Sequence, residues 1–133
     1  MAQKKMILDL DTGVDDALAL AYALATPESD LIGIAASYGN TLVETAAQNS
    51  LKLLETLGAT DVPVFLGEGH SLTTSSFETM PISMAIHGQN GIGDVVLPQA
   101  QRKIETQSAV DFIIAAAHQY GEDLIIVPTG PLT

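Results

Sequence analysis

The sequence contains no cysteine and no tryptophan, and only five of its 133 residues are lysine or arginine. Without cysteine the chain can form no disulfide, no thiolate metal site and no cysteine nucleophile. The five basic residues face 16 acidic ones, and the formal net charge of −11 argues against nucleic acid or an anionic membrane as a partner. Long hydrophobic runs are also missing, since the longest, residues 17–25, is too short to cross a bilayer. No signal-peptide core follows the first methionine, so a cytoplasmic location is expected.

Aliphatic side chains dominate what is present, because 47% of the residues are hydrophobic but only 5% are aromatic. High hydrophobicity combined with high acidity is not the pattern of a disordered chain, in which charge accompanies low hydrophobicity. The chain is therefore expected to be globular. Its length allows at most one domain with a real core.

Short β-type runs alternate with helical ones, which is typical of a parallel sheet covered on both faces. Four strands are predicted, at residues 5–11, 31–37, 62–66 and 124–127. The expected fold class is α/β, a Rossmann-like and mostly parallel sheet with flanking helices. The long segment 67–107, rich in glycine, serine and threonine, is expected to be a binding loop or lid. Residues 128–133 begin another strand-to-helix turn without its helix, so the domain is expected to be truncated.

Capping signals mark the ends of two helices. The first is predicted to begin near Asp15 and to end before Pro27, because the residue ahead of a proline disfavours helix. The third is predicted over residues 107–120, with Ser108 at its start in capping-box spacing and Gly121 at its end.

The second helix is predicted to begin at Asn40 or Thr41. Thr41 and Glu44 have the spacing of a capping box, and Gly58 is suited to a left-handed carboxyl-terminal cap. Helical periodicity places five apolar residues on its inner stripe: Val43, Ala47, Leu51, Leu54 and Leu57.

Four aspartates fall within eight residues: Asp9, Asp11, Asp15 and Asp16. Carboxylates this close repel one another, and each pKa would rise unless a cation or a set of donors compensated the charge. They lie between the first strand and the first helix, a turn that in open α/β sheets lies at the ligand-binding edge. A divalent metal with hard oxygen ligands is the simplest compensator. An EF-hand is excluded, because its spacing puts glycine one residue after Gly13 and glutamate at the position of Leu20.

This turn resembles the nucleophile motif of haloacid-dehalogenase-like phosphatases, which have two aspartates at a strand end. The corresponding pair here would be Asp9 and Asp11. Those proteins have threonine or valine two residues after the second aspartate, where this chain has Gly13, and they lack the pair Asp15 and Asp16. The phosphatase is therefore the second hypothesis.

A closer resemblance is to the nucleoside hydrolases, the inosine-uridine-preferring N-ribohydrolases. That family opens with a strand and an Asp-x-Asp-x-Gly-x-Asp-Asp turn, which residues 9–16 match. Three motifs follow in the family's order at similar spacing: Ser-Tyr-Gly-Asn at 37–40, His-Gly-Gln-Asn-Gly-Ile-Gly at 87–93, and Val-Pro-Thr-Gly-Pro-Leu-Thr at 127–133. The likeness covers the whole chain but only the amino-terminal part of the family's fold. Residues 1–133 are accordingly expected to be that part of a single α/β domain.

The resemblance implies calcium-dependent hydrolysis of the N-glycosidic bond of ribonucleosides. Asp11 would be a calcium ligand and the general base for the attacking water. Asp16 would be a second, bidentate calcium ligand, and Thr129 would bind the ion through its backbone carbonyl, which leaves its side chain without a role. These roles suit the chemistry, because carboxylates stabilise an oxocarbenium-like transition state and a metal lowers the pKa of bound water.

The same resemblance implies contacts with the substrate. Asp15 and Asn40 would hydrogen-bond the ribose hydroxyls, and His87 would lie near the mouth of the pocket as a further catalytic candidate. Asn40 could instead cap the second helix, and His87 could be a solvated loop histidine. Thr12 replaces the proline usual in the family, which is expected to affect the rigidity of the turn more than the chemistry.

In the family a further aspartate ligand and a leaving-group histidine lie beyond the position of Thr133. The chain is therefore expected to hold half of a site, without activity of its own. Exposed sheet predicts a homo-oligomer or association with the missing carboxyl-terminal segment. The non-enzyme hypothesis is a catalytically silent fragment that binds calcium weakly or serves in assembly.

Overall fold

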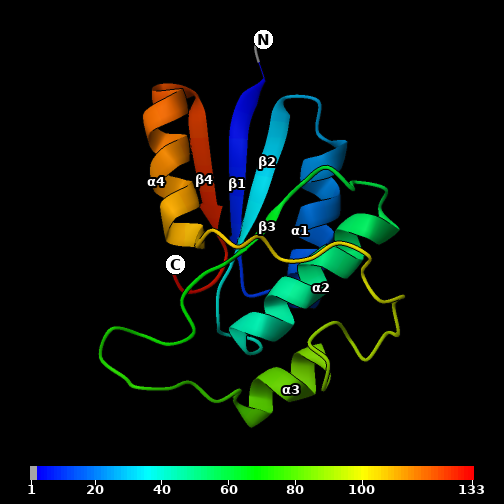
Figure 1. Cartoon of the computed structure of the whole chain (residues 1–133). Coiled ribbons are helices and arrows are strands. Elements are labelled where there is room, and N and C mark those ends of the chain that lie inside the picture. Colours follow the sequence, from blue (N-terminus) through cyan, green and yellow to red (C-terminus); the bar gives the residue numbers. More distant parts are fainter. Residues whose placement is uncertain (1–2) are drawn as a thin grey trace.

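Four parallel strands form the sheet at the centre of the molecule, in the order β3-β2-β1-β4 (Figure 1). The computed structural model describes residues 3–133. The strands are β1 (Lys4–Leu10), β2 (Ser29–Ala36), β3 (Val64–Leu66) and β4 (Leu124–Pro128). The chain runs outward from β1 to β3 and then returns to the far side of β1 at β4. The order therefore reverses between β1 and β4, and ligands bind at such a switch point at the carboxyl ends of the strands.

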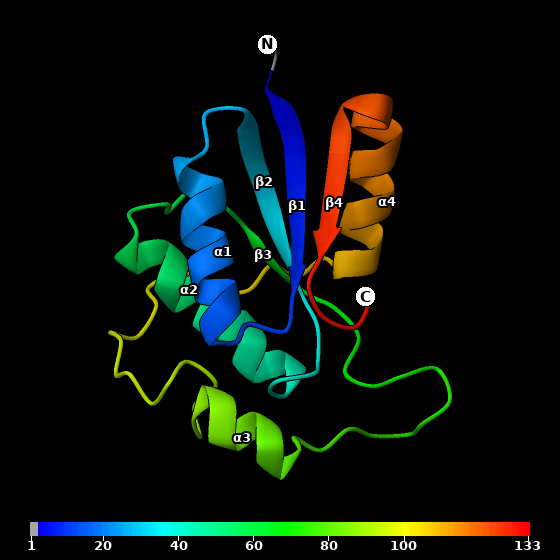
Figure 2. The same ribbon diagram turned by 180° about the vertical axis from the view of Figure 1, so that it is seen from behind.

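Helices cover both faces of this sheet, as the opposite views in Figures 1 and 2 show. The helices are α1 (Val14–Ala25), α2 (Val43–Thr56), α3 (Pro81–His87) and α4 (Ala109–Tyr120), with the short 3₁₀ turn η1 (Gly121–Asp123) after α4. One face carries α1 and α2, the other carries α4, and α3 lies beyond the carboxyl ends of the strands. The predicted α/β fold class, a parallel sheet with flanking helices, is confirmed.

The core has two parts because successive side chains of a strand point to opposite faces of the sheet. Leu8 and Leu10 of β1 pack with α1 and α2, whereas Ile7 packs with α4. On the α4 side the rings of Phe65 and Phe112 stack with their centroids 3.9 Å apart. None of the helices described within residues 3–133 has the length and continuous hydrophobicity needed to span a bilayer.

Most of the predicted helix ends are confirmed. α1 begins one residue before the predicted start, at Val14. At the start of α4, Ser108 Oγ accepts a hydrogen bond from the backbone N–H of Asp111 at 3.1 Å. The glycines that end α2 and α4 have positive φ angles, +77° at Gly58 and +51° at Gly121. These ends could be predicted because each depends on residues that are neighbours in the sequence.

The predicted start of the second helix was wrong. α2 begins at Val43, its N-cap is Leu42, and no side chain caps it. The capping box fails because Thr41 belongs to the preceding turn, where its carbonyl accepts a hydrogen bond from the N–H of Gly39 at 3.0 Å. Of the predicted inner stripe, four residues are buried, but Leu57 lies past the end of the helix and is 46% exposed.

The long segment 67–107 is not wholly a loop, because it contains α3. The clue in the sequence was Pro81, since proline is favoured at the first position of a helix. The helix ends at His87, and Gly88, with a φ of +77°, is its C-cap. Helix α3 places His87 next to the acidic turn, so the segment 67–107 contributes to the site.

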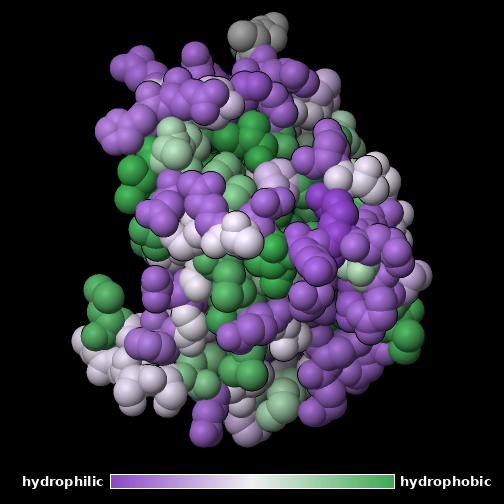
Figure 3. All heavy atoms as spheres, in the orientation of Figure 1, coloured by the Kyte–Doolittle hydropathy of each residue, from purple (hydrophilic) through white to green (hydrophobic). Residues whose placement is uncertain are grey.

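The sheet remains partly uncovered on the side of β4. Ile125 and Ile126 are 40% and 39% exposed. Beside α1 an apolar groove of about 250 Å³ is lined from the sheet by Met6, Leu8 and Val127 and from the helix mainly by alanine and tyrosine. Hydrophobic surface also appears over α4 in Figure 3. The amount of exposed apolar surface agrees with the expectation of an incompletely covered sheet.

Candidate functional site

The acidic turn lies at the carboxyl end of β1, next to the switch between β1 and β4. The four aspartates of this turn differ in how far their side chains are exposed to solvent. Asp9, Asp11 and Asp16 are 2%, 5% and 2% exposed, whereas the side chain of Asp15 is 72% exposed. Asp15 and Asp16 both lie in the first turn of α1, where the helix dipole favours negative charge. Of the predicted site carboxylates, Asp11 and Asp16 are thus inside the protein together with Asp9, and Asp15 faces solvent from the same turn.

Two turns enclose the carboxylate of Asp11. The backbone N–H of Asn40 donates to its Oδ2 at 2.7 Å. A Cβ at Gly39 would collide with the same oxygen, and a Cβ at Gly130 would lie 2.7 Å from Oδ1. Gly39 also has a φ of +151°, which residues with a side chain rarely adopt. The glycines of both turn motifs are therefore required for the close approach of the backbone to Asp11.

Asp16 is held from both sides. Its Oδ2 accepts from the N–H of Gly13 at 3.2 Å, and its Oδ1 accepts from the hydroxyl of Thr129 at 2.7 Å. Burial raises the pKa of this carboxyl to about 6, and the nearby Asp11 adds to the rise, against the lowering effect of the two hydrogen bonds. The two donors therefore do not fully compensate a carboxylate that is buried beside another one.

Asp9 has a different set of partners. Its Oδ1 accepts from the hydroxyl of Thr133 and its Oδ2 from the backbone N–H of Thr133, both at 3.0 Å. Burial raises the pKa of Asp9, and the hydrogen bonds from Thr133 oppose that rise. Both oxygens of Asp9 accept hydrogen bonds from Thr133, and the side chain of Ser37 also lowers the pKa of Asp9.

His87 contacts the start of α1 from the end of α3. Its Nδ1 accepts a hydrogen bond from the backbone N–H of Val14 at 3.1 Å, and this contact defines the tautomer with the proton on Nε2. The His87 side chain is 11% exposed, and its Nδ1 lies 3.8 Å from Asp15 Oδ1. A side chain at Gly13 would collide with both His87 and Asn40. The structure thus gathers the predicted substrate-side residues around one glycine.

The side chain of Thr129 has a role that the sequence did not predict. Its hydroxyl holds Asp16, and its N–H donates to the carbonyl of Asp9 at 3.0 Å. Sequence reasoning also missed Thr133, although both threonines belong to the Pro-Thr-Gly-Pro-Leu-Thr motif. Thr12, buried where the family usually has proline, hydrogen-bonds Ser50 of α2 at 2.8 Å between the two hydroxyl oxygens.

The donor set suits a hard cation but is incomplete. Asp11 and Asp16 offer carboxylate oxygens, which Ca²⁺ and Mg²⁺ prefer, and burial, with a smaller contribution from Asp11, raises the pKa of Asp16 despite its two hydrogen-bond donors. Within residues 3–133, however, no three His, Asp or Glu side chains cluster as metal ligands. Calcium takes about six to eight oxygen ligands. The described residues can therefore supply only part of a calcium coordination sphere.

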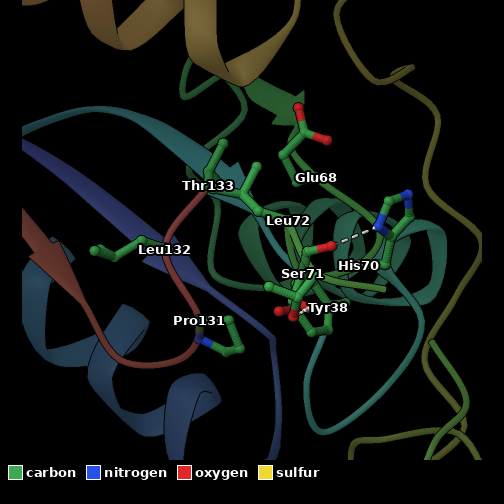
Figure 4. Close-up of a pocket in the computed structure, with 9 residues that line it drawn as sticks. Tyr38, Glu68, His70, Ser71, Leu72, Pro131, Leu132 and Thr133 are labelled. Carbon is green, nitrogen blue, oxygen red and sulfur yellow. Dashed lines mark hydrogen bonds between the residues drawn. The ribbon is translucent and has the colours of Figure 1, made fainter. Parts of the chain in front are cut away.

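A cavity of about 480 Å³ adjoins this site (Figure 4). Residues next to Gly39 and Gly130 line it, which places it beside Asp11. Its lining combines carboxylate, imidazole, hydroxyl and apolar groups: Tyr38, Glu68, His70, Ser71, Leu72, Thr73, Pro131, Leu132 and Thr133. The ring of Tyr38 also packs against Phe77, with centroids 4.8 Å apart, and this contact holds part of the segment 67–107 over the site.

Comparison with solved structures shows the same fold in enzymes of one family. A purine-preferring ribonucleoside hydrolase from Gardnerella vaginalis matches with a TM-score of 0.95 and 56% identity, over 96% of this chain and 40% of that one. Uridine nucleosidase 1 of Arabidopsis thaliana is 37% identical over 131 residues, which cover 98% of this chain and 38% of the relative. An uncharacterised protein from Corynebacterium ammoniagenes is 53% identical over 91 residues, covering 68% of this chain and 95% of that protein.

The chain therefore spans about 40% of the length of the named hydrolases that it matches. The family model described as inosine-uridine preferring nucleoside hydrolase matches residues 6–133, a range that contains all four motifs of the sequence and all the contacts of the acidic turn. The resemblance predicted from those motifs is confirmed, and the chain belongs to the inosine-uridine preferring nucleoside hydrolase family.

Proposed function

We propose that this chain forms one wall of a calcium-dependent site that hydrolyses the N-glycosidic bond of ribonucleosides to ribose and free base. The observation that carries the proposal is the buried pair Asp11 and Asp16, whose partners come from the Gly-Asn and Pro-Thr-Gly turns. Asp11, Asp16 and the backbone carbonyl of Thr129 would hold the ion. Bound calcium would lower the pKa of a water molecule and orient the ribose diol.

Asp11 is suited to take the proton of the attacking water. The N–H of Asn40 binds its Oδ2 and holds the carboxylate in one orientation. The negative charge of Asp11 and Asp16 would stabilise the positive charge that develops on the ribose as the glycosidic bond breaks.

The remaining predicted residues would bind the nucleoside. Asp15, with its carboxylate exposed in the first turn of α1, can accept a hydrogen bond from a ribose hydroxyl. Asn40 commits its backbone N–H to Asp11, so its side-chain amide is the group left for the sugar. His87 has only Nε2–H to offer, because Nδ1 accepts from Val14, and that N–H could donate to the departing base.

The phosphatase alternative fits the geometry less well. Its nucleophile would be one of the pair Asp9 and Asp11. Both oxygens of Asp9 accept hydrogen bonds from Thr133, and the glycine turns crowd Asp11. Both oxygens of Asp9 are thus already hydrogen-bonded, which weakens its case as the nucleophile.

Calcium titration by calorimetry tests the metal site. Because the chain supplies only part of the ligands, we expect weak binding, with a Kd on the order of 10⁻⁴–10⁻³ M. Asp11→Asn should abolish it, whereas the exposed Asp61→Asn should leave it unchanged. A folded sample that binds no calcium would rule out the proposed ion site.

An assay for free base released from inosine or uridine tests the reaction itself. Release that requires calcium and Asp11 supports hydrolysis by this chain. Calcium binding without release identifies a silent calcium-binding fragment instead. Phosphate release from a phosphomonoester, with a covalent aspartyl adduct, would favour the phosphatase.

We further infer that the uncovered sheet is buried by association, either with a second copy or with a carboxyl-terminal part of the family fold. Tyr22, which is 74% exposed, lines the apolar groove beside α1. Sedimentation velocity should therefore detect an oligomer, and Tyr22→Lys should shift it toward monomer. Leu72→Lys, at a fully exposed position of the long segment, is the matched control. A wild-type chain that sediments as a stable monomer at all concentrations contradicts self-association.

A further inference from the structure

We propose that Asp9 is a positioning residue, whose carboxylate anchors Thr133 and thereby fixes residues 129–133, the β4 turn, against the site. The comparisons and the proposed function give Asp9 no role. The effect of this anchor on calcium binding rests on the proposed function, but the anchoring of Thr133 by Asp9 depends only on contacts within the chain.

Asp9 binds both ends of the β4 turn. Its backbone carbonyl accepts the N–H of Thr129 at the beginning of the turn. Its two carboxylate oxygens accept the N–H and the hydroxyl of Thr133 at the end, each at 3.0 Å. One residue of β1 therefore closes the turn into a loop, in which both ends are fixed relative to the central strand.

Residues of the β4 turn contact the proposed calcium ligands Asp11 and Asp16. Thr129 donates its hydroxyl to Asp16 at 2.7 Å. Gly130 lies so close to Asp11 that an added Cβ would be 2.7 Å from Oδ1. A turn released at Thr133 could move away from both carboxylates, and the proposed ligand carbonyl of Thr129 would move with it.

A carboxylate suits the geometry of this anchor, because each of its two oxygens accepts one hydrogen bond. Thr133 presents two donors, and a carboxylate can accept from both, whereas asparagine would turn one of its acceptors into a donor. The fit is also close, because a Cβ at Gly67 would collide with the hydroxyl of Thr133. Gly67 follows β3, so the β4 turn reaches across the end of the sheet from β4 to β3.

Amide hydrogen exchange on the metal-free chain tests the anchor directly. In Asp9→Asn we expect the N–H of Thr133 to exchange at least tenfold faster, with acceleration at Gly130 and Thr129. The amides of α2, such as Ala46 and Ala47, should keep their protection. Uniform acceleration throughout the chain would reduce Asp9 to a general stability role and overturn the proposal.

Variants of the partner residue make the test independent of how well Asp9→Asn folds. Thr133→Val removes the hydroxyl but keeps the backbone N–H, and should accelerate exchange in the β4 turn. Thr133→Ser restores the hydroxyl and should restore protection. If Thr133→Val leaves exchange in the turn unchanged, the side-chain anchor is refuted.

Calcium affinity separates this proposal from the proposed function. If the wild type binds calcium, Asp9→Asn should weaken binding at least tenfold although Asp9 is not a ligand, and unchanged affinity would contradict the positioning role. If the wild type binds no calcium, the metal site fails, while exchange at Thr133 still decides whether Asp9 anchors the turn.

Discussion

Replacing Asp16 with asparagine is expected to stabilise the metal-free protein at pH 7 while abolishing calcium binding. The raised pKa, about 6 against an ordinary 3.8, corresponds to a cost on the order of 2–3 kcal/mol for keeping this buried carboxylate charged. Asparagine removes the charge but loses part of the hydrogen bonding to Gly13 and Thr129, worth about 1 kcal/mol. The net gain should be about 1–2 kcal/mol, a rise in Tm of roughly 3–8 °C.

The pH dependence of this gain follows from the direction of the shift. Between about pH 4 and pH 6 the folded state binds more protons at Asp16 than the unfolded state, so the wild-type protein loses stability as the pH rises. Asp16→Asn lacks this loss. The difference between the two proteins should therefore grow from pH 4 to pH 6 and stay constant above that, as measured by urea unfolding at a series of pH values.

Asp15→Asn is the matched control, because it changes a carboxylate in the same helical turn that is 72% exposed. Its Tm should stay within about 2 °C of wild type. Calcium should raise the Tm of the wild type but not that of Asp16→Asn, since a ligand stabilises only the protein that binds it. A destabilised Asp16→Asn would show that its carboxylate is well compensated without a metal.

Gly39→Ala is expected to destabilise the protein by at least about 3 kcal/mol, because the cost of a steric clash adds to the cost of an unfavourable φ angle. The new Cβ would collide with Oδ2 of Asp11, and the φ of +151° is unfavourable for alanine. The carboxylate would have to leave the N–H of Asn40, so calcium binding should be lost as well. Urea unfolding and calorimetric titration measure the two effects.

Two other glycines separate the causes. Gly58 has a φ of +77° with open space around it, so Gly58→Ala carries backbone strain alone and should cost about 1 kcal/mol. Gly130→Ala carries the steric conflict with Asp11 without a positive φ. Adding Asp11→Ala should relieve much of the cost of Gly39→Ala and Gly130→Ala but none of the cost of Gly58→Ala. Equal costs at Gly39 and Gly58 would mean that Asp11 moves aside without penalty.

The sequence was sufficient for those parts of the fold that depend on near neighbours. The strands, the ends of α1 and α4 and the glycine cap of α2 follow from hydrophobic pattern and capping residues that lie a few positions apart. The predicted start of α2 was wrong because Thr41 belongs to a turn around Asn40. This turn places Gly39 against Asp11. Local propensity carries no information about such a distant contact.

The site, like the fold, could be predicted only where it depends on residues close together in the sequence. The four aspartates and the glycine turns are visible as motifs, and their common position at the carboxyl edge follows from the parallel sheet. The different hydrogen-bond partner of Asp9 could not be predicted, because that partner, Thr133, is 124 positions away in the sequence. The hydroxyl of Thr129 was missed for the same reason, since its partner Asp16 is 113 positions earlier.

These separations have a consequence for the order in which the chain is made. Asp9, Asp11 and Asp16 leave the ribosome more than a hundred residues before Thr129, Gly130 and Thr133, an interval of several seconds at about 5–20 residues per second. During that interval β1 lacks its partner β4, and three acids destined for burial remain hydrated and repel one another. The acidic turn is therefore synthesised well before the residues that it needs to reach its final structure, as expected for contacts with a high cost of loop closure.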